Sequence, residues 1–514
     1  MTTVQRRLAS YILREHFGDI VETVGSYLVQ KGARSLREII FDTKLKKEQV
    51  QKALCSLVQH KLVVHEEKKK NVLLYSLEIE KILLYLRFPR FVMAAKSLFD
   101  DTGKLIIEEI IKHGAIPMSV IVDNVVEQFK CAGLNSTESD VRKVFSNLVE
   151  GHYLYRLSQD SQGEEGSDEK MFVLPPETSG KRKRSNDSDQ PAKRLKTGDG
   201  RSSQDSYEIA DQGIRWSINY KRFHQLFLEQ EIISAVEKKF DSVAAEIVRT
   251  MFKTDELSRD IQAVTTKPIT FYEIAKSLPK NCRIENSRIS QYLSLMIDDR
   301  DKLVRKQDES GGGTYVIDMK NCVTTLCQHT LQSILQERYG SNALRIFRLL
   351  LQKDHLEQKQ IGELSMIPSK DAKELLYKLF SEKIINMQEV PKTADYAPSR
   401  TFYLFSVNLK QLSRMHLERC YQTQGNLMSR RQSETQDNRR LLEKQERMDA
   451  TIAGLRAQHG EEAAAEAVSE LEELITEADK EQLKKLKVTL DKLQQAELQV
   501  DETAFILSQY ITNY

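Results

Sequence analysis

The stretch VQKALCSLVQHKLVVH (residues 50–65) decides the fold, because it joins the pattern of a helix directly to that of a strand. Its apolar residues recur at i, i+4, i+7 and i+8, which places four side chains on one stripe of an α-helix: Val50, Leu54, Leu57 and Val58. An extended apolar run opens five residues after the i+7 position, at Leu62. A core-facing helix, a tight polar turn and a β-ribbon form the second half of a winged helix.

The same spacing returns three more times: Val141, Phe145, Leu148, Val149; Ile289, Leu293, Met296, Ile297; and Ala372, Leu376, Leu379, Phe380. The extended run follows at Tyr153, Leu303 and Ile384, with the third copy needing a longer turn. We therefore predict a mainly α chain with small β-ribbons, organised as four tandem winged helices. Such a chain favours nucleic-acid handling or scaffolding over an enzyme with its own active site.

The charge of the chain is unevenly distributed. Of the net +2, the segment KRKRSNDSDQPAKRLK (residues 181–196) contributes +5, with seven Lys and Arg against two Asp, so the remainder is about −3. Phosphate neutralisation dominates the affinity of proteins for duplex DNA. A folded body so near neutrality therefore argues against tight, autonomous DNA binding.

Several classes of protein find no support in the sequence. No run of ~18 uncharged apolar residues occurs and the N-terminus MTTVQRRLAS lacks a secretory pattern, so we expect no membrane span. The six cysteines are scattered, which predicts reduced core thiols of an intracellular protein rather than a zinc site. Neither H-E-x-x-H nor a phosphate loop nor G-x-S-x-G is present, so we expect no catalytic residue, metal or cofactor.

The length of 514 residues predicts several domains of roughly 100–200 residues or fewer. In the second winged helix we expect Tyr153–Leu157 to pair with Met171–Leu174. The predicted limits are 1–100 for winged helix 1 with an extra helix, 101–174 for winged helix 2, 175–211 for a disordered basic linker, 212–335 for winged helix 3 with flanking helices, 336–410 for winged helix 4, and 411–514 for an antiparallel helical hairpin or coiled coil.

The C-terminal region carries the periodicity of packed helices. Leu441, Met448 and Leu455 recur every seven residues, and leucines resume this pattern from Leu471 onward. Glycine is a natural helix terminator, so two antiparallel helices reversing at Gly460 are the simplest interpretation. One such seam is short, and we expect it to pack on another surface.

Basic residues on the patterned helices and in the first ribbon are the candidates for DNA contact. They are Lys46, Lys47, Lys52, Lys68, Lys69, Lys70, Arg142, Lys143, Arg288, Lys370 and Lys373. The alternative is that they are ordinary solvated charges, because each helix also carries acidic or polar neighbours. Winged helices also dock proteins, and the weak positive charge favours that use for most copies.

Two basic clusters in the predicted linker resemble a nuclear import signal: Lys181, Arg182, Lys183, Arg184 and Lys193, Arg194, Lys196. Import receptors need extended, exposed Lys and Arg, which a disordered segment supplies. The alternative is a nonspecific basic segment that touches nucleic acid. We favour import, and hence a nuclear protein.

A family resemblance rests on the opening residues REHFGDIVETVGSYLVQKGARSLREII (residues 14–40), together with the tandem winged helices, the basic linker and the C-terminal hairpin. The whole chain resembles the large winged-helix subunit of eukaryotic RNA polymerase III, which is related to the transcription factor TFIIE alpha. The resemblance implies membership of a heterotrimer near the polymerase clamp, with two partner subunits. It further implies contact with the initiation factor TFIIIB and with promoter DNA, single-stranded or melted, at transfer-RNA and 5S ribosomal-RNA genes.

The resemblance supplies no catalytic residue, and it also implies a role of the polymerase in sensing cytosolic DNA. Two other classes of function remain open from the residues. One is a sequence-specific transcription factor, which would need base-reading Arg or Asn on a basic helix face. The other is a winged-helix scaffold of a nonnuclear complex, against which the basic linker argues.

Overall fold

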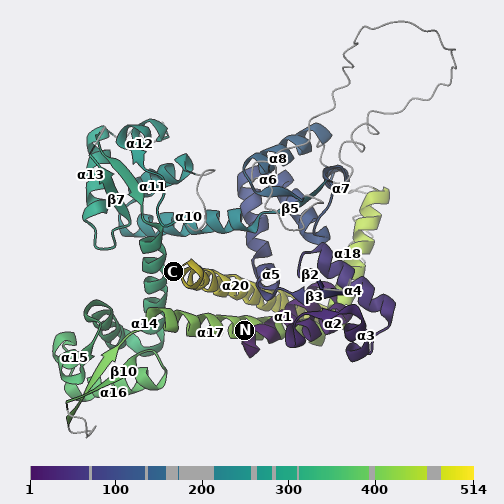
Figure 1. Cartoon of the computed structure of the whole chain (residues 1–514). Coiled ribbons are helices and arrows are strands. Elements are labelled where there is room, and N and C mark those ends of the chain that lie inside the picture. Colours follow the sequence, from purple (N-terminus) through teal and green to yellow (C-terminus); the bar gives the residue numbers. More distant parts are fainter. Residues whose placement is uncertain are drawn as a thin grey trace, which may run out of the picture. The chain divides into compact units, whose positions relative to one another are not determined.

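A computed structural model describes residues 2–68, 72–133, 137–157, 172, 214–255, 263–279, 285–309, 312–392, 400–459 and 476–513. The chain forms two compact units. The N-terminal unit consists of Phe17–Glu231 with Glu256–Ile261, and the C-terminal unit of Met1–His16, Ile232–Asp255 and Gln262–Tyr514. Each unit contains two winged helices (Figure 1).

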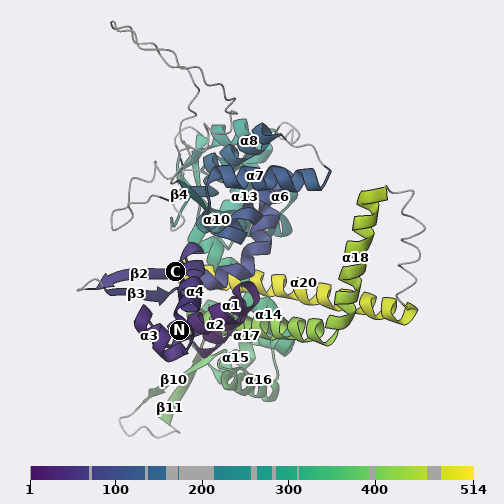
Figure 2. The same cartoon turned by 90° about the vertical axis from the view of Figure 1, so that its right-hand side faces the viewer.

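The first winged helix follows the predicted order. Its elements are α2 (Asp19–Lys31), β1 (Arg34–Ser35), α3 (Leu36–Thr43), α4 (Lys47–Gln59), β2 (Val63–Lys68) and β3 (Val72–Leu77). The sheet has the order β1-β3-β2, and β2 and β3 extend from the helices as a long antiparallel ribbon (Figure 2). Ser35 caps the start of α3, since its backbone N–H donates to Glu38 Oε2 at 2.9 Å in a capping box.

The second winged helix is built from α6 (Phe88–His113), α7 (Met118–Cys131), α8 (Glu138–Glu150), β4 (Leu154–Leu157) and β5 (Arg215–Ile218). It follows α5 (Ile79–Leu83) and the 3₁₀ turn η1 (Leu84–Arg87). Non-helical backbone at Phe99 and Asp100 divides α6, so the two helices predicted on either side of this point are distinct. Thr137 caps α8, because its hydroxyl accepts from the backbone N–H of Asp140 at 3.3 Å.

β4 pairs with β5, in the register Leu154↔Ile218, which the sequence patterns did not predict. The expected partner Met171–Leu174 lies outside the described residues except for Phe172. The reason is burial: Trp216 on β5 is 0% exposed and meets the Phe145 ring edge-on at 5.4 Å. Arg215–Ile218, which falls in the range expected for the third winged helix, is therefore paired with a strand of the second.

The third winged helix belongs to the C-terminal unit. Helix α10 (Tyr220–Lys239) leads to α11 (Ser242–Thr254), β6 (Ile269–Thr270), α12 (Phe271–Ser277), α13 (Asn286–Asp298), β7 (Val304–Asp308) and β8 (Thr314–Ile317). The sheet order β6-β8-β7 repeats that of the first winged helix, with the short strand again directly before a helix. Thr270 and Glu273 form the capping box there, as Ser35 and Glu38 do in the first copy.

Helix α14 (Met319–Lys353) joins the third winged helix to the fourth (Figure 1). It bends at Gly340, whose φ of 83° is a left-handed value that glycine adopts without strain. The fourth copy then uses β9 (Leu356–Glu357), α15 (Gln358–Ser365), α16 (Ser369–Ser381), β10 (Asn386–Pro391) and β11 (Thr401–Ser406). Ser369 is the first helical residue of α16, and Pro368 occupies the cap position.

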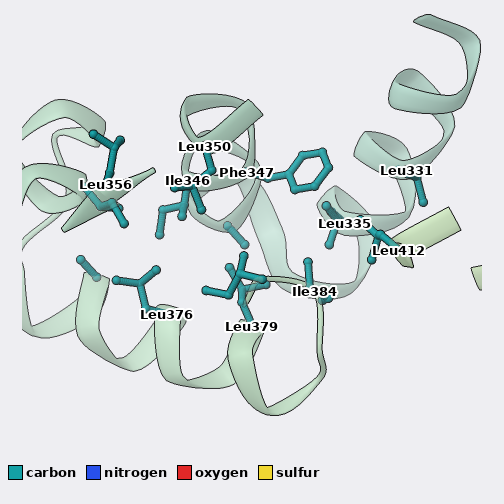
Figure 3. Packing of buried hydrophobic residues seen from close by; sticks show 14 of the residues in the cluster. Leu331, Leu335, Ile346, Phe347, Leu350, Leu356, Leu376, Leu379, Ile384 and Leu412 are labelled. Carbon is teal, nitrogen blue, oxygen red and sulfur yellow. The ribbon is translucent and has the colours of Figure 1, made fainter. Parts of the chain in front are cut away.

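Figure 3 shows the core of the fourth winged helix, where Ile346, Phe347 and Leu350 of α14 face Leu376 and Leu379 of α16. The same cluster continues to Leu412 of α17 (Leu409–Asp437) and Leu507 of α20 (Glu477–Asn513). The apolar core of this winged helix is thus continuous with that of the C-terminal helices.

Helices α17 and α20 pack on each other, and α1 (Thr3–Phe17) is joined to both through Arg431. Arg431 of α17 donates both to Glu15 Oε1 at 2.7 Å and to Glu497 Oε1 at 3.0 Å. Gly425 of α17 lies against α1, because a Cβ there would lie 3.8 Å from the Tyr11 ring, an ordinary van der Waals contact. The sequence patterns did not predict this packing of α1.

The predicted seam of Leu441, Met448 and Leu455 lies on α18 (Arg439–His459). This helix crosses α20 near one end (Figure 2), where Lys444 pairs with Asp479 at 3.3 Å and Gln482 donates to Asn438 at 2.8 Å. The long partner of α20 is α17 instead, because α17 carries the buried side chains Leu412, Tyr421 and Met428. The expected reversal at Gly460 lies outside the described residues.

Candidate nucleic-acid interface

The four patterned helices, α4, α8, α13 and α16, bury the predicted stripe. At the i, i+4 and i+7 positions of all four, no side chain is more than 4% exposed. The i+8 position differs: Val149 is 0% exposed, whereas Val58 is 36% and Phe380 41% exposed. The buried stripe is thus narrower than predicted, and the opposite face of each helix is available for binding.

In the first winged helix the candidate lysines stand at the start and on the outer face of α4. Lys46, Lys47 and Lys52 are all exposed, and none of their side chains has a hydrogen-bond or ion-pair partner within the part of the chain that the structure describes. Lys68 ends β2, and Lys69 and Lys70 lie outside the described residues. Residues 1–100 carry 18 Lys and Arg against 11 Asp and Glu, so this winged helix has an excess of positive charge.

The second winged helix has the opposite character. Arg142 is held by Glu138 at 2.7 Å and Lys143 by Asp140 at 3.2 Å, one turn back on α8. Residues 101–174 carry seven Lys and Arg against 13 Asp and Glu. Because both candidate cations are paired on an acidic domain, this face is poorly suited to phosphate.

In the fourth winged helix Lys370 and Lys373 stand on the outer face of α16. Both are exposed and have no side-chain partner among the described residues. Tyr377, one turn further on, is 75% exposed. The spacing i, i+3, i+7 puts all three on one stripe, and cations beside an exposed aromatic ring are typical of sites for single-stranded nucleic acid.

Sequence reasoning missed Tyr377, although its signal was present in the repeats. When the four helices are aligned on their buried stripes, the three positions read Glu48, Gln51, Cys55 in α4; Ser139, Arg142, Ser146 in α8; Ser287, Ser290, Ser294 in α13; and Lys370, Lys373, Tyr377 in α16. Only the last set combines charge with an aromatic ring. Arg288 of α13 is exposed, but it lies beside serines.

The remaining chemistry-bearing residues form no site. Within the described ranges, no group of three or more His, Cys, Asp or Glu side chains could hold a metal ion, and no helix is long and apolar enough to cross a membrane. Cys55 and Cys131 are exposed, so the prediction that the cysteines are core thiols is wrong for these two. The two clusters of the predicted import signal lie outside the described residues.

The fold therefore defines a tandem winged-helix protein whose helices turn differently charged outer faces to solvent. Comparison with protein families agrees along most of the chain. Residues 7–66 match the helix-turn-helix domain of RNA polymerase III subunit RPC82, and residues 143–326 match RNA polymerase III subunit RPC82. Residues 331–407 match the C-terminal winged-helix domain of POLR3C, and residues 440–506 match the helical hairpin domain of DNA-directed RNA polymerase III subunit RPC3.

Curated relatives extend this similarity to the full length. DNA-directed RNA polymerase III subunit RPC3 of Homo sapiens is 42% identical over 534 residues, which cover 99% of each chain. The subunit of Danio rerio is 41% identical over 544 residues, covering 100% of this chain and 99% of the relative. The subunit of Dictyostelium discoideum is 31% identical over 258 residues, 48% of this chain and 39% of its own.

The chain belongs to the RPC3 family of DNA-directed RNA polymerase III subunits. It is a component of that polymerase, and other polymerase III subunits are its partners. The predicted family and the predicted combination of winged helices with a helical hairpin are both confirmed.

Proposed function

We propose that this chain is a noncatalytic subunit that docks a polymerase III-specific heterotrimer onto the polymerase and assists promoter opening. Two partner subunits and the clamp region would occupy its protein-binding faces. The observation that carries the proposal is the full-length similarity to RPC3 subunits, combined with outer helix faces that bear lysines without a side-chain partner among the described residues.

DNA contact would be shared between the first and fourth winged helices. Both present exposed lysines without side-chain partners, and the domains carrying them hold an excess of basic residues. Such contacts neutralise phosphates without reading bases, so they suit melted promoter DNA at transfer-RNA and 5S ribosomal-RNA genes. TFIIIB would hold the polymerase at those promoters, and the same DNA contacts would serve any sensing of cytosolic DNA by the enzyme.

The test is promoter opening by the complete polymerase with Lys46, Lys47 and Lys52 replaced by Gln. We expect less permanganate reactivity of promoter thymines, with unchanged elongation from a preformed DNA bubble. Equal opening by the variant and wild-type enzymes would refute DNA contact by the first winged helix. Nucleotide incorporation by the isolated chain would refute its noncatalytic role.

The two basic clusters between β4 and β5 would deliver the chain to the nucleus. Imaging a version with Lys181–Arg184 and Lys193–Lys196 changed to Gln should show cytoplasmic accumulation of newly made protein. Undiminished nuclear accumulation would remove this assignment.

We retain the predicted domain limits of 1–100, 101–174, 212–335, 336–410 and 411–514 as a proposal, except that Arg215–Ile218 is counted with the second winged helix. Limited proteolysis should then cut within 158–213 and leave β5 attached to the N-terminal fragment. Separation of the two strands under native conditions would contradict this division.

A further inference from the structure

A groove of about 880 Å³ lies in the C-terminal unit, outside the outer faces of the winged-helix α-helices. The two arms of α14 form its floor, because the bend at Gly340 brings Arg348 back to Gln332, whose Oε1 accepts from Arg348 Nε at 2.9 Å. The turn after α13 forms one wall, and the turn between α15 and α16, which ends at Met366, forms another.

The groove is strongly cationic. Arg300, Lys302, Arg345 and Arg348 all line it and are exposed. For the first three, the structure gives no side-chain hydrogen bond or ion pair with any described residue. Four positive side chains thus share one concave surface with no protein anion assigned to three of them.

Asp301 is the one acidic side chain among the described lining residues, and it is paired with a lysine. Asp301 accepts a hydrogen bond from Lys239, which also donates to Asp299. Burial alone would lower the pKa of Lys239, but its hydrogen bonds to these two carboxylates outweigh burial and raise the pKa. Lys239 therefore stays charged and offsets part of the negative charge of Asp299 and Asp301, and the four cations of the groove outnumber its one carboxylate.

The side chains of the groove fit phosphate better than any neutral ligand. The guanidinium group is planar, stays charged and matches phosphate with two parallel N–H donors. Further donors come from Asn321, Gln328 and Gln352. His329 carries the one ring among the described lining residues, and Phe, Tyr and Trp are absent from them, so binding would follow the backbone without regard to sequence.

The neighbourhood of the groove favours a nucleic acid over an acidic peptide. Met366 lines the groove, and α16 begins three residues later at Ser369. The next residue, Lys370, opens the stripe that continues through Lys373 to Tyr377. A strand of DNA leaving the groove would therefore meet two further cations and an exposed aromatic ring.

We propose that this groove holds the phosphate backbone of single-stranded DNA. The inference rests on the proposed function, since it supplies a second contact for the same melted DNA. The inference differs from the proposed function because it assigns the contact to Arg300, Arg345 and Arg348, which lie outside α4, α8, α13 and α16.

The test uses the full-length chain and a fluorescent 20-nucleotide oligo-dT, with anisotropy measured from 50 to 200 mM salt. We expect the triple variant Arg300→Gln, Arg345→Gln, Arg348→Gln to bind roughly tenfold or more weakly at low salt. Its slope of log K against log salt should flatten by about 2, because each lost single-strand phosphate contact contributes about 0.7. The charge-matched control replaces Arg6, Arg414 and Arg440, which are exposed and likewise lack a side-chain partner, with Gln.

Three outcomes would overturn the inference: no binding by the wild-type chain, unchanged binding by the triple variant, or an equal loss of binding in the control. Displacement of the oligonucleotide by poly-glutamate at equal charge concentration would also overturn it, because it would assign the groove to an acidic peptide. Binding that survives in the triple variant but falls when Lys46, Lys47 and Lys52 become Gln would refute the groove and leave the proposed function intact. A matching melting temperature for the triple variant and the wild-type chain excludes misfolding as the cause of any loss.

Discussion

The second and fourth winged helices have the same buried stripe and opposite outer faces. Phe145 of α8 and Leu376 of α16 occupy the same position of the pattern and are 0% and 2% exposed. On the outer faces, Arg142 is paired with Glu138, whereas Lys370 has no side-chain partner among the described residues. The comparison shows that the apolar stripe specifies the module and leaves its binding chemistry free to differ.

The largest expected effect concerns the shared core. Phe145→Ala removes a fully buried ring in contact with Trp216, and should lower the free energy of unfolding by about 3–5 kcal/mol. Trp216 is the only tryptophan, so urea unfolding followed by its fluorescence reports on the second winged helix alone. The matched change Leu376→Ala should leave that transition in place, and a shift of similar size would mean that the two modules unfold together.

The second winged helix also differs in its attachment to the first. Lys61 Nζ donates to the Tyr155 hydroxyl at 2.5 Å, and burial, followed by repulsion from Lys81, lowers the pKa of Lys61 to about 7. Between pH about 7 and about 10 the unfolded chain then binds more protons than the folded one, so stability rises with pH.

Between pH 7.5 and pH 9.5, the free energy of unfolding should rise by about 1–2 kcal/mol because of Lys61. Denaturant titrations at the two pH values, in the wild-type chain and in Lys61→Met, measure it by difference. Methionine keeps the length of the side chain and removes the titrating group. Equal pH dependence in the two proteins would show that Lys61 is not desolvated.

A smaller effect is expected when cations on the outer faces of α16 and α8 are replaced and DNA binding is measured. Lys370→Gln with Lys373→Gln should weaken binding of oligo-dT by the full chain about three- to tenfold at 50 mM salt, because two phosphate contacts are lost. The matched pair Arg142→Gln with Lys143→Gln should change it less than twofold, since these cations are already occupied by Glu138 and Asp140. Anisotropy titrations compare the two, and the reverse order of effects would break the contrast.

The smallest expected effect concerns the residues that begin α8 and α16 and their contributions to stability. Thr137→Ala removes a cap whose hydroxyl accepts from the Asp140 N–H, at a cost of about 1 kcal/mol. Ser369→Ala should change stability by less than about 0.5 kcal/mol, because this hydroxyl makes no cap hydrogen bond. Hydrogen exchange of peptides spanning α8 and α16 measures both, and faster exchange in α16 alone would contradict the assignment of the caps.

Much of each module could be predicted from sequence, because its signals are local. The stripe of Val141, Phe145 and Leu148, the capping box at Ser35 and the hairpin after Leu62 depend on residues within a few turns of one another. The candidate lysines were likewise found from their positions on the helices. Whether a cation is paired, as Arg142 is, requires the rotamers of its neighbours as well.

The sequence by itself determined the winged-helix repeats and the family of this chain. The repeats follow from short-range apolar spacing, and the family follows from residue identity. The tertiary structure decided which distant strand completed the second ribbon, that α1 joined α17 and α20, and that Arg300, Arg345 and Arg348 faced one groove. These choices depend on burying Trp216, Gly425 and the arms of α14 against residues far along the chain. The spacing of apolar residues within one helix or strand does not identify a partner that lies far along the chain.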